Sequence, residues 1–422
     1  MASPPAESCT IDGFGPLPVR RPGSVTELCQ LVREARAAGQ AIYPLGGGTR
    51  LDLGLPPARA GVAVDLRGLD QVIDYPARDM TITVQAGITV ARLQEILRGE
   101  NQRLPVDVAL PERATLGGAI ATNASGPRRF GHGTLRDYVI GITVVNDRGE
   151  EAKAGGRVVK NVAGYDLCKL YTGALGTLGV ISQVTLKVKP LPEAQAILVV
   201  PCPYEQIDAV LDRLHRTATR PVCLDLINPA AGAELNRRLG GDAFFPKTWS
   251  LVIGLEENRE ATDWQVRQLT GELPHELGNT ARRLLDDDAE PLWRELRDFA
   301  LWPEARFSFK VNMLPSQVRS FTEVGDYAVG PLLQVHAGSG IVVGHVGGDD
   351  FGIAQAKQLL EALNVVISGG PGRVTVTRCP PEWKSALPVW GAPRGDWELM
   401  RKVKEKLDPD RLFNPGRFVG GI

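Results

Sequence analysis

The 422-residue chain lacks the features that mark metal-cluster, nucleic-acid-binding and membrane-spanning proteins. No apolar run approaches the roughly 18 residues that a spanning helix needs. The net charge is −1, and basic residues do not gather with aromatics on one face, so no nucleic-acid interface is predicted. None of the six cysteines forms a Cys-x-x-Cys pair, so the chain encodes no local iron–sulfur or zinc motif: Cys9, Cys29, Cys168, Cys202, Cys223 and Cys379.

The chain also lacks the two commonest nucleotide-binding motifs. It has no Gly-x-x-x-x-Gly-Lys-Ser/Thr, and no Gly-x-Gly-x-x-Gly opens an apolar helix. It does have a short apolar strand that runs into Pro44-Leu-Gly-Gly-Gly-Thr49. Glycines can take positive φ and approach a ligand closely, so converging N–H groups here suit a pyrophosphate. A plain turn is the alternative interpretation.

Two further segments are rich in small residues. The segment 111–126 contains Thr-Leu-Gly-Gly-Ala-Ile-Ala-Thr-Asn-Ala-Ser-Gly, which permits close approach to a flat ligand. A buried helix start with a tight turn would have a similar composition. The third segment runs from Lys160 to Leu167 and continues through Gly173-Ala-Leu-Gly-Thr-Leu-Gly-Val-Ile181.

In this order, the three segments resemble the PCMH-type FAD-binding domain of the vanillyl-alcohol oxidase flavoprotein superfamily. The segment Leu407–Phe418 resembles the C-terminal signature of that family, where the chain returns to the flavin domain. Within the superfamily, the nearest likeness is to the FAD-binding subunits of bacterial glycolate oxidases.

The resemblance implies which residues contact FAD. It places the pyrophosphate on the glycine loop, the ribityl chain and isoalloxazine ring along the second segment, and the adenine side against the third. Some members bind flavin covalently through a His beside the glycines; Leu45 precedes them here, so non-covalent FAD is expected. The implied contacts are Pro44, Gly46, Gly47, Gly48 and Thr49, then Thr115, Gly117, Gly118, Ala121, Thr122 and Gly126, and finally Gly179 and Val180. Gly47→Val is predicted to abolish FAD retention, because a β-branched residue cannot take positive φ and would intrude on the pyrophosphate.

The predicted fold class is α+β. The resemblance gives a two-subdomain FAD-binding domain over 1–192, a shortened α+β cap over 193–400 and a C-terminal segment, 401–422, packed on the FAD domain. Periodicity agrees: Thr81–Gly87 alternates as a strand, and Val90, Leu93 and Leu97 recur at helical spacing. In the cap, the segment 206–216 predicts an amphipathic helix between strands.

The cap does not carry the metal site of the larger catalytic relatives. These have His-x-Gly-Asp-Gly-Asn-x-His, whereas this chain has Ser339, Ile341 and Val343 at the Asp, Asn and second His positions. His345 lies two residues further along, on the same face of a strand as Val343. No metal ion is therefore predicted.

Two cap residues are candidates for catalysis. His336 is either an acid/base near the flavin or an imidazole hydrogen-bonded within the cap core. Lys310 alternates with apolar neighbours and projects from a half-buried strand. Weaker candidates for carboxylate binding or acid/base roles are Arg294, Arg297, Arg306 and His132, for which solvated or structural roles are the alternative.

The preferred hypothesis is an FAD-binding subunit that oxidises glycolate or a similar 2-hydroxy acid with a larger FAD-binding catalytic subunit and an iron–sulfur subunit. The alternatives are a self-sufficient 2-hydroxy acid dehydrogenase and a structural assembly subunit with an inert flavin fold. The N-terminus has no charged region before an apolar core, so a cytoplasmic protein is expected, with partners as the route to any membrane association.

Overall fold

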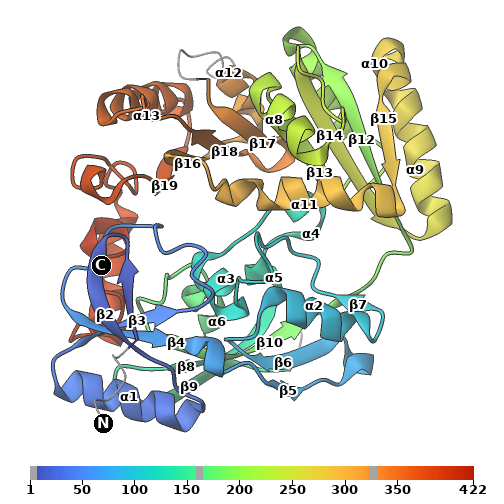
Figure 1. Ribbon diagram of the computed structural model, residues 1–422. Helices are drawn as coiled ribbons and strands as arrows, with labels where there is room; N and C mark the ends of the chain where they lie inside the picture. Colours follow the sequence, from blue (N-terminus) through green and yellow to red (C-terminus); the bar gives the residue numbers. More distant parts are fainter. Residues whose placement is uncertain (1–6, 158–164, 323–329) are drawn as a thin grey trace. The chain divides into compact units, whose positions relative to one another are not determined.

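The computed structural model describes residues 7–157, 165–322 and 330–422 and contains two compact units (Figure 1). Unit 1 comprises residues 1–124, 134–191 and 392–422, and unit 2 comprises 125–133 and 192–391. The mixed α+β class predicted from the sequence is confirmed. The structure assigns the short stretch 125–133 to unit 2, and the C-terminal segment joins unit 1 from residue 392 instead of 401.

The first sheet of unit 1 has four strands. Its order is β1-β2-β4-β3, with β4 parallel to both β2 and β3: β1 (Ser8–Ile11), β2 (Phe14–Arg20), β4 (Gly61–Asp65) and β3 (Ala41–Leu45). Helix α1 (Val25–Ala37) begins at the N-cap Ser24, whose hydroxyl accepts from Glu27 N. The buried face of α1 packs Leu28 and Val32 with Ile42, so helix and sheet share one core.

The second sheet of unit 1 is antiparallel, in the order β5-β6-β10-β8-β9. Its strands are β5 (Val72–Asp74), β6 (Thr81–Gln85), β10 (Val180–Lys187), β8 (Val139–Val145) and β9 (Glu151–Gly155). The associated helices are α2 (Val90–Arg98), α3 (Leu116–Thr122), α5 (Leu135–Tyr138) and α6 (Leu167–Tyr171). Strands β7 (Gln102–Arg103) and β11 (Lys189–Pro190) form a separate pair. As predicted, Val90, Leu93 and Leu97 form the buried face of α2, and Thr89 caps it.

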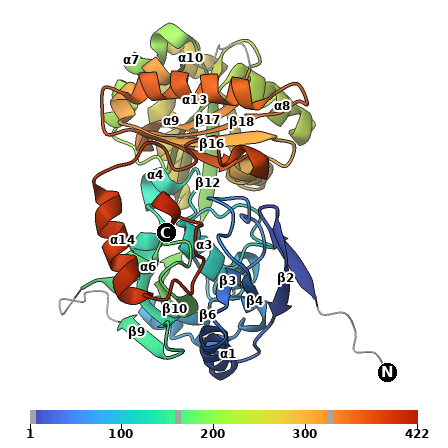
Figure 2. The same cartoon turned by 90° about the vertical axis from the view of Figure 1, so that its left-hand side faces the viewer.

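The end of the chain returns to unit 1. Helix α14 (Asp396–Leu407), labelled in Figure 2, packs its Val403 and Leu407 against the core of the second sheet. Beyond it the chain runs along β3: Ile42 N donates to Leu412 O at 2.7 Å, and Asn414 N donates to Ile42 O at 2.9 Å. The C-terminal segment thereby reaches the start of the glycine loop.

Unit 2 is built on an eight-stranded antiparallel sheet with the order β15-β12-β14-β13-β17-β18-β16-β19. The strands are β15 (Arg282–Leu285), β12 (Ala194–Cys202), β14 (Trp249–Glu257), β13 (Cys223–Ile227), β17 (Leu332–His336), β18 (Ile341–Val346), β16 (Phe307–Asn312) and β19 (Arg373–Arg378). The helices are α4 (Arg129–His132), α7 (Ile207–His215), α8 (Pro229–Leu239), α9 (Arg259–Glu272), α10 (His275–Thr280), α11 (Glu290–Asp298), α12 (Val318–Thr322) and α13 (Ile353–Ile367).

One core of unit 2 lies between the sheet and helices α8 and α11, with Leu235, Trp293 and Val252 among its members. Five tryptophans in the second half of the chain differ in their burial. Trp293, Trp302 and Trp383 are buried, whereas Trp390 and Trp397 are half-buried. Of the helices in the described part of the chain, none is long and apolar enough to cross a membrane.

Candidate functional site

The glycine loop, which we define as residues 46–50, follows β3 directly, and its glycines serve different purposes. Only Gly48 of the three takes positive φ, at 70°. A Cβ on Gly46 would overlap the hydroxyl of Thr115, and a Cβ on Gly47 would overlap the carbonyl oxygen of Arg113. The expectation that Gly47 needs positive φ is therefore wrong: this position excludes side chains because another backbone segment lies against it.

The loop carries a run of unused backbone donors. In the described chain, no hydrogen bond uses the backbone N–H groups of Gly47, Gly48, Thr49 or Arg50. Most backbone donors in folded proteins are paired, with water or a ligand as the partner where no protein group serves. Consecutive unpaired N–H groups form the concave positive surface that binds phosphate oxygens.

The second glycine-rich segment faces this loop with threonine side chains. Thr115 is the N-cap of α3, and its hydroxyl accepts from Gly118 N at 3.3 Å. Thr122 donates its hydroxyl to Gly118 O at 2.9 Å, which leaves its oxygen lone pairs available. The segment is a short helix, as the structural interpretation expected, and it also lines the pocket described next.

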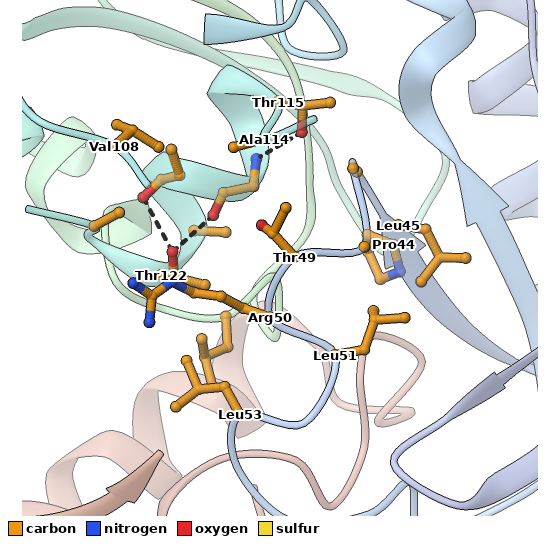
Figure 3. Close-up of a pocket in the computed structure, with 18 of the residues that line it drawn as sticks. Pro44, Leu45, Thr49, Arg50, Leu51, Leu53, Val108, Ala114, Thr115 and Thr122 are labelled. Atoms are coloured by element: carbon orange, nitrogen blue, oxygen red, sulfur yellow. Dashed lines mark hydrogen bonds between the residues drawn. The ribbon is translucent and has the colours of Figure 1, made fainter. Parts of the chain in front are cut away.

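The loop and α3 border one pocket (Figure 3). The pocket brings together nine residues that the sequence predicted: Pro44, Gly46, Gly47, Gly48, Thr49, Thr115, Gly118, Ala121 and Thr122.

The other predicted contacts lie elsewhere. Gly117 packs against Ala86, and Gly179 packs against Val144. Val180 is fully buried in β10, opposite Val145 of β8, and Gly126 belongs to unit 2. These four residues do not line the pocket. The part of the third segment over 158–164, which includes Lys160, lies outside the described residues.

Three pocket residues with polar side chains were missed by sequence reasoning: Arg50, Asn414 and Arg417. Asn414 donates its side-chain amide to Leu175 O, and Arg417 donates to Leu51 O, Leu53 O and Leu55 O at 2.7–3.0 Å. The C-terminal signature that contains Asn414 and Arg417 was recognised, but no role was assigned to either side chain. Arg50 directly follows the glycine motif.

The lining of the pocket is small, apolar or hydroxyl-bearing and cationic. Among the described residues that line it, none is a carboxylate, histidine, cysteine or tyrosine. Burial lowers the pKa of Arg417 and of Arg50 below their ordinary values. The pocket is thus suited to an anionic ligand.

Several polar side chains share one face of the unit 2 sheet, which we call the polar face: Asp225, Ser308, Lys310, Gln334, His336 and His345. Strand register produces this arrangement. Asp225 lies opposite His336, and Gln334 lies opposite Val343, which lies opposite Lys310.

The two histidines of the polar face have different surroundings. His345 uses both ring nitrogens: Nε2 donates to Phe299 O at 2.7 Å, and Nδ1 meets Ser308 Oγ at 2.8 Å. His336 Nδ1 donates to the buried Asp225 carboxylate at 2.8 Å. In the described part of the structure, no hydrogen bond uses His336 Nε2, and the side chain keeps 8% exposure. His336 therefore makes one hydrogen bond within the core through Nδ1, and its Nε2 is available to accept a proton.

The weaker candidates are mostly held by neighbours. His132 Nε2 and Arg128 Nε both contact the buried Glu256 carboxylate, at 3.0 and 2.6 Å, which gives Arg128 a structural ion pair. Arg297 pairs with Asp298, and Arg306 donates to Asp349 O. Arg294 is exposed on α11, and Lys310 is half-buried, as its alternating strand predicted.

No metal centre is found among the residues that the structure describes, where no three His, Cys, Asp or Glu side chains gather. All six cysteines have free thiols, and five of them are buried.

Comparisons with known proteins agree with this architecture. Residues 16–155 match the family model described as an FAD binding domain, and residues 392–418 match the model of the C-terminal domain of FAD linked oxidases. The chain is also similar in structure to alkyldihydroxyacetonephosphate synthase, with a TM-score of 0.65 and 19% identity over 94% of this chain and 76% of that one. At this identity the likeness concerns the fold.

Three curated relatives are informative. A D-2-hydroxyglutarate dehydrogenase of Xanthomonas citri pv. viticola is 36% identical over 44% of this chain and 40% of its own length. Glycolate oxidase subunit GlcE of Escherichia coli is 33% identical over 40% of this chain and 49% of its length. These matches span less than half of each relative. A D-lactate dehydrogenase of Archaeoglobus fulgidus is 26% identical over 99% of this chain and 96% of its length.

Proposed function

We propose that this chain, which belongs to the FAD-dependent oxidoreductases, holds FAD non-covalently in the unit 1 pocket and acts in the oxidation of glycolate or a related 2-hydroxy acid to the 2-oxo acid. The observation that carries this proposal is the glycine loop, with four consecutive unpaired N–H groups opposite a threonine-bearing helix in one pocket. The relatives are named for 2-hydroxy acid substrates, which supports the substrate class.

The lining of the pocket supports non-covalent binding. Covalent flavin attachment needs a nucleophilic side chain such as His, Cys or Tyr, and the described residues that line the pocket include none of these. FAD would therefore be held by hydrogen bonds and by the shape of the pocket. The flavin should therefore be released on denaturation in acid.

Oxidation of a 2-hydroxy acid needs an acceptor for hydride, a base for the hydroxyl proton and a cation for the carboxylate. Bound FAD supplies the hydride acceptor. His336 Nε2 is suited to receive the hydroxyl proton, because Asp225 fixes the proton on Nδ1 and would stabilise the imidazolium that forms. Lys310, on the same face of the sheet, is the candidate cation.

We favour a role beside a larger FAD-binding catalytic subunit and an iron–sulfur subunit, because the chain lacks the metal-binding histidines of larger relatives and any iron–sulfur motif of its own. Similarity to glycolate oxidase subunit GlcE supports this role. A self-sufficient dehydrogenase is the second candidate. It is favoured by the His336–Asp225 pair and by the D-lactate dehydrogenase that matches along almost the whole chain.

The deciding experiment is anaerobic addition of glycolate, D-lactate or D-2-hydroxyglutarate to the purified chain, followed by its flavin absorbance. Bleaching by a substrate would identify a complete dehydrogenase. Bleaching only by photoreduction would support an electron-relaying subunit, and a flavin that neither treatment reduces would support an assembly role. A chain that purifies without flavin and does not take up added FAD would contradict the proposal.

If a substrate bleaches the flavin, variants of the polar face test the base. His336→Gln should slow reduction about 10²- to 10⁴-fold with unchanged flavin content, the range for loss of a general base. His345→Gln is the matched control, since both its ring nitrogens already have partners; it should lower the melting temperature and leave the rate of reduction nearly unchanged. Equal slowing by both variants would argue against His336 as the base.

A further inference from the structure

Arg50 lies at the end of the glycine loop and lines the pocket. Figure 3 draws its side chain directed from the loop to the side of the pocket where Thr122 lies. Within the described residues, its guanidinium makes no hydrogen bond and no salt bridge. Asp52 is the charged neighbour that acts on it, and only through space.

Arg417 lines the same pocket and provides the comparison. Its guanidinium donates to three backbone carbonyls, of Leu51, Leu53 and Leu55, and lies 3.8 Å from the carboxylate of Asp12. Arg417 therefore holds the chain that follows the glycine loop. Arg50 has no such role, although burial also acts on it and lowers the pKa of its guanidinium.

A guanidinium in partly desolvated surroundings is costly unless an anion compensates it. The described residues that line the pocket include no carboxylate, and Asp52, outside that lining, acts on Arg50 without a hydrogen bond or salt bridge. The adjoining loop offers unpaired backbone N–H groups at Gly47, Gly48 and Thr49, which also lack an acceptor. The cation and the amides line the same pocket. An Arg fork matches phosphate oxygens in geometry as well as in charge.

We propose that Arg50 binds the pyrophosphate of FAD from the side chain while the glycine loop binds it from the backbone, so that this chain selects flavins by their phosphates through Arg50. This inference rests on the proposed binding of FAD. Arg50 would then supply a part of the affinity for FAD that depends on the negative charge of the ligand. This part should weaken as the salt concentration rises.

The test is titration of the deflavinated 422-residue chain with FAD, ADP and riboflavin, followed by quenching of flavin fluorescence or by calorimetry. Arg50→Gln should weaken FAD and ADP about 10- to 100-fold, as expected for loss of charge-assisted hydrogen bonds. Binding of riboflavin, which has no phosphate, should stay within about twofold. Arg50→Lys should recover part of the loss, because it restores the charge but not the fork.

Salt and folding provide independent readouts. The FAD dissociation constant of the wild type should rise more steeply with salt than that of Arg50→Gln, because screening acts on the charge that the variant lacks. The melting temperature of the flavin-free Arg50→Gln chain should equal or exceed that of the wild type, since no protein partner is lost. Arg98→Gln is the control, because it removes the same charge from the exposed end of α2, outside the pocket. It should change neither the salt dependence of the FAD dissociation constant nor the melting temperature.

The possible failures are distinguishable. If the wild type binds no FAD, the proposed function fails. If it binds FAD but Arg50→Gln weakens FAD and riboflavin equally, or leaves FAD unchanged, only the role of Arg50 is overturned. A clear drop in melting temperature of the flavin-free Arg50→Gln and Arg50→Lys chains would also overturn it, because it would show a structural role.

Discussion

The pocket of unit 1 and the polar face of unit 2 are built from opposite materials. The pocket consists largely of backbone and small side chains, and its donors include main-chain N–H groups of the glycine loop. The polar face consists of long polar side chains that strand register brings together, such as His336 with Asp225. A backbone site tolerates almost no added atoms, whereas a side-chain site tolerates changes in shape but not the loss of a partner.

The sharpest test of this contrast is a single added methyl group. Gly47→Ala should cost more than about 4 kcal/mol, because the new Cβ would overlap the carbonyl oxygen of Arg113 in a neighbouring backbone segment. Gly48→Ala should cost only about 1–2 kcal/mol, since its Cβ would make only an ordinary contact, 3.9 Å from Leu51 Cδ1, and the cost is that of positive φ. Thermal unfolding and the flavin-to-protein absorbance ratio of the two variants measure the difference.

Similar losses in both variants would show that backbone conformation, and not contact with the segment around Arg113, sets the demand for glycine in this loop. Normal flavin content in Gly47→Ala would contradict the described packing of the loop. The same measurements separate two explanations for the loss of FAD predicted for Gly47→Val. One is positive φ, which Gly47 does not have, and the other is overlap with a neighbouring group.

The sequence predicted much of the pocket because glycine patterns report backbone constraints directly. Pro44 to Thr49 all line the pocket, and Thr115, Gly118, Ala121 and Thr122 line it from one short helix. Arg417 could not be predicted in the same way, because its partners at Leu51 to Leu55 are more than 360 residues away. Arg50 was adjacent to the motif, but its lack of partners becomes visible only in three dimensions.

The polar face was less predictable. Alternation placed His336 and Lys310 on strands, but the partner of His336 is 111 residues earlier in the chain, on a strand brought alongside by the sheet order. Sequence reasoning therefore left the core and catalytic interpretations of His336 open. The grouping of 125–133 with unit 2 was missed for the same reason: Arg128 and His132 meet Glu256 only after folding.

Unit 1 also contains a buried side-chain ion pair, which tests how far the contrast holds. Lys404 of α14 donates to Asp408, Thr177 O and Phe413 O, and both charged groups are buried. Lys404→Met should cost about 3–5 kcal/mol, because it leaves the Asp408 carboxylate buried without its cation. The segment that carries Asn414 and Arg417 should loosen as well, so FAD retention should fall with stability.

Lys402→Met is the control for this prediction. Lys402 lies on the same helix, is 68% exposed and approaches Glu398 at 3.8 Å, so its loss should change stability by less than about 0.5 kcal/mol. Melting temperature and flavin release rate are measured for both variants. If Lys404→Met lowered stability but kept the flavin, the C-terminal segment would be shown to stabilise unit 1 without shaping the pocket.

Both units contain buried thiols. We expect these thiols to make the folded protein slightly less stable at alkaline pH. Burial raises the pKa of the Cys168 thiol in unit 1 to about 11 and that of Cys202 in unit 2 to about 12, from 9.0. The folded chain therefore keeps protons that the unfolded chain loses above pH 9, so stability falls as pH rises from about 8 to 10. The expected loss is about 1.4 kcal/mol for each thiol. Urea unfolding at pH 8 and pH 10 measures it, and Cys168→Ala and Cys202→Ala should each remove one such contribution. A variant that lost as much stability as the wild type over this range would show that its thiol already ionises in the folded chain.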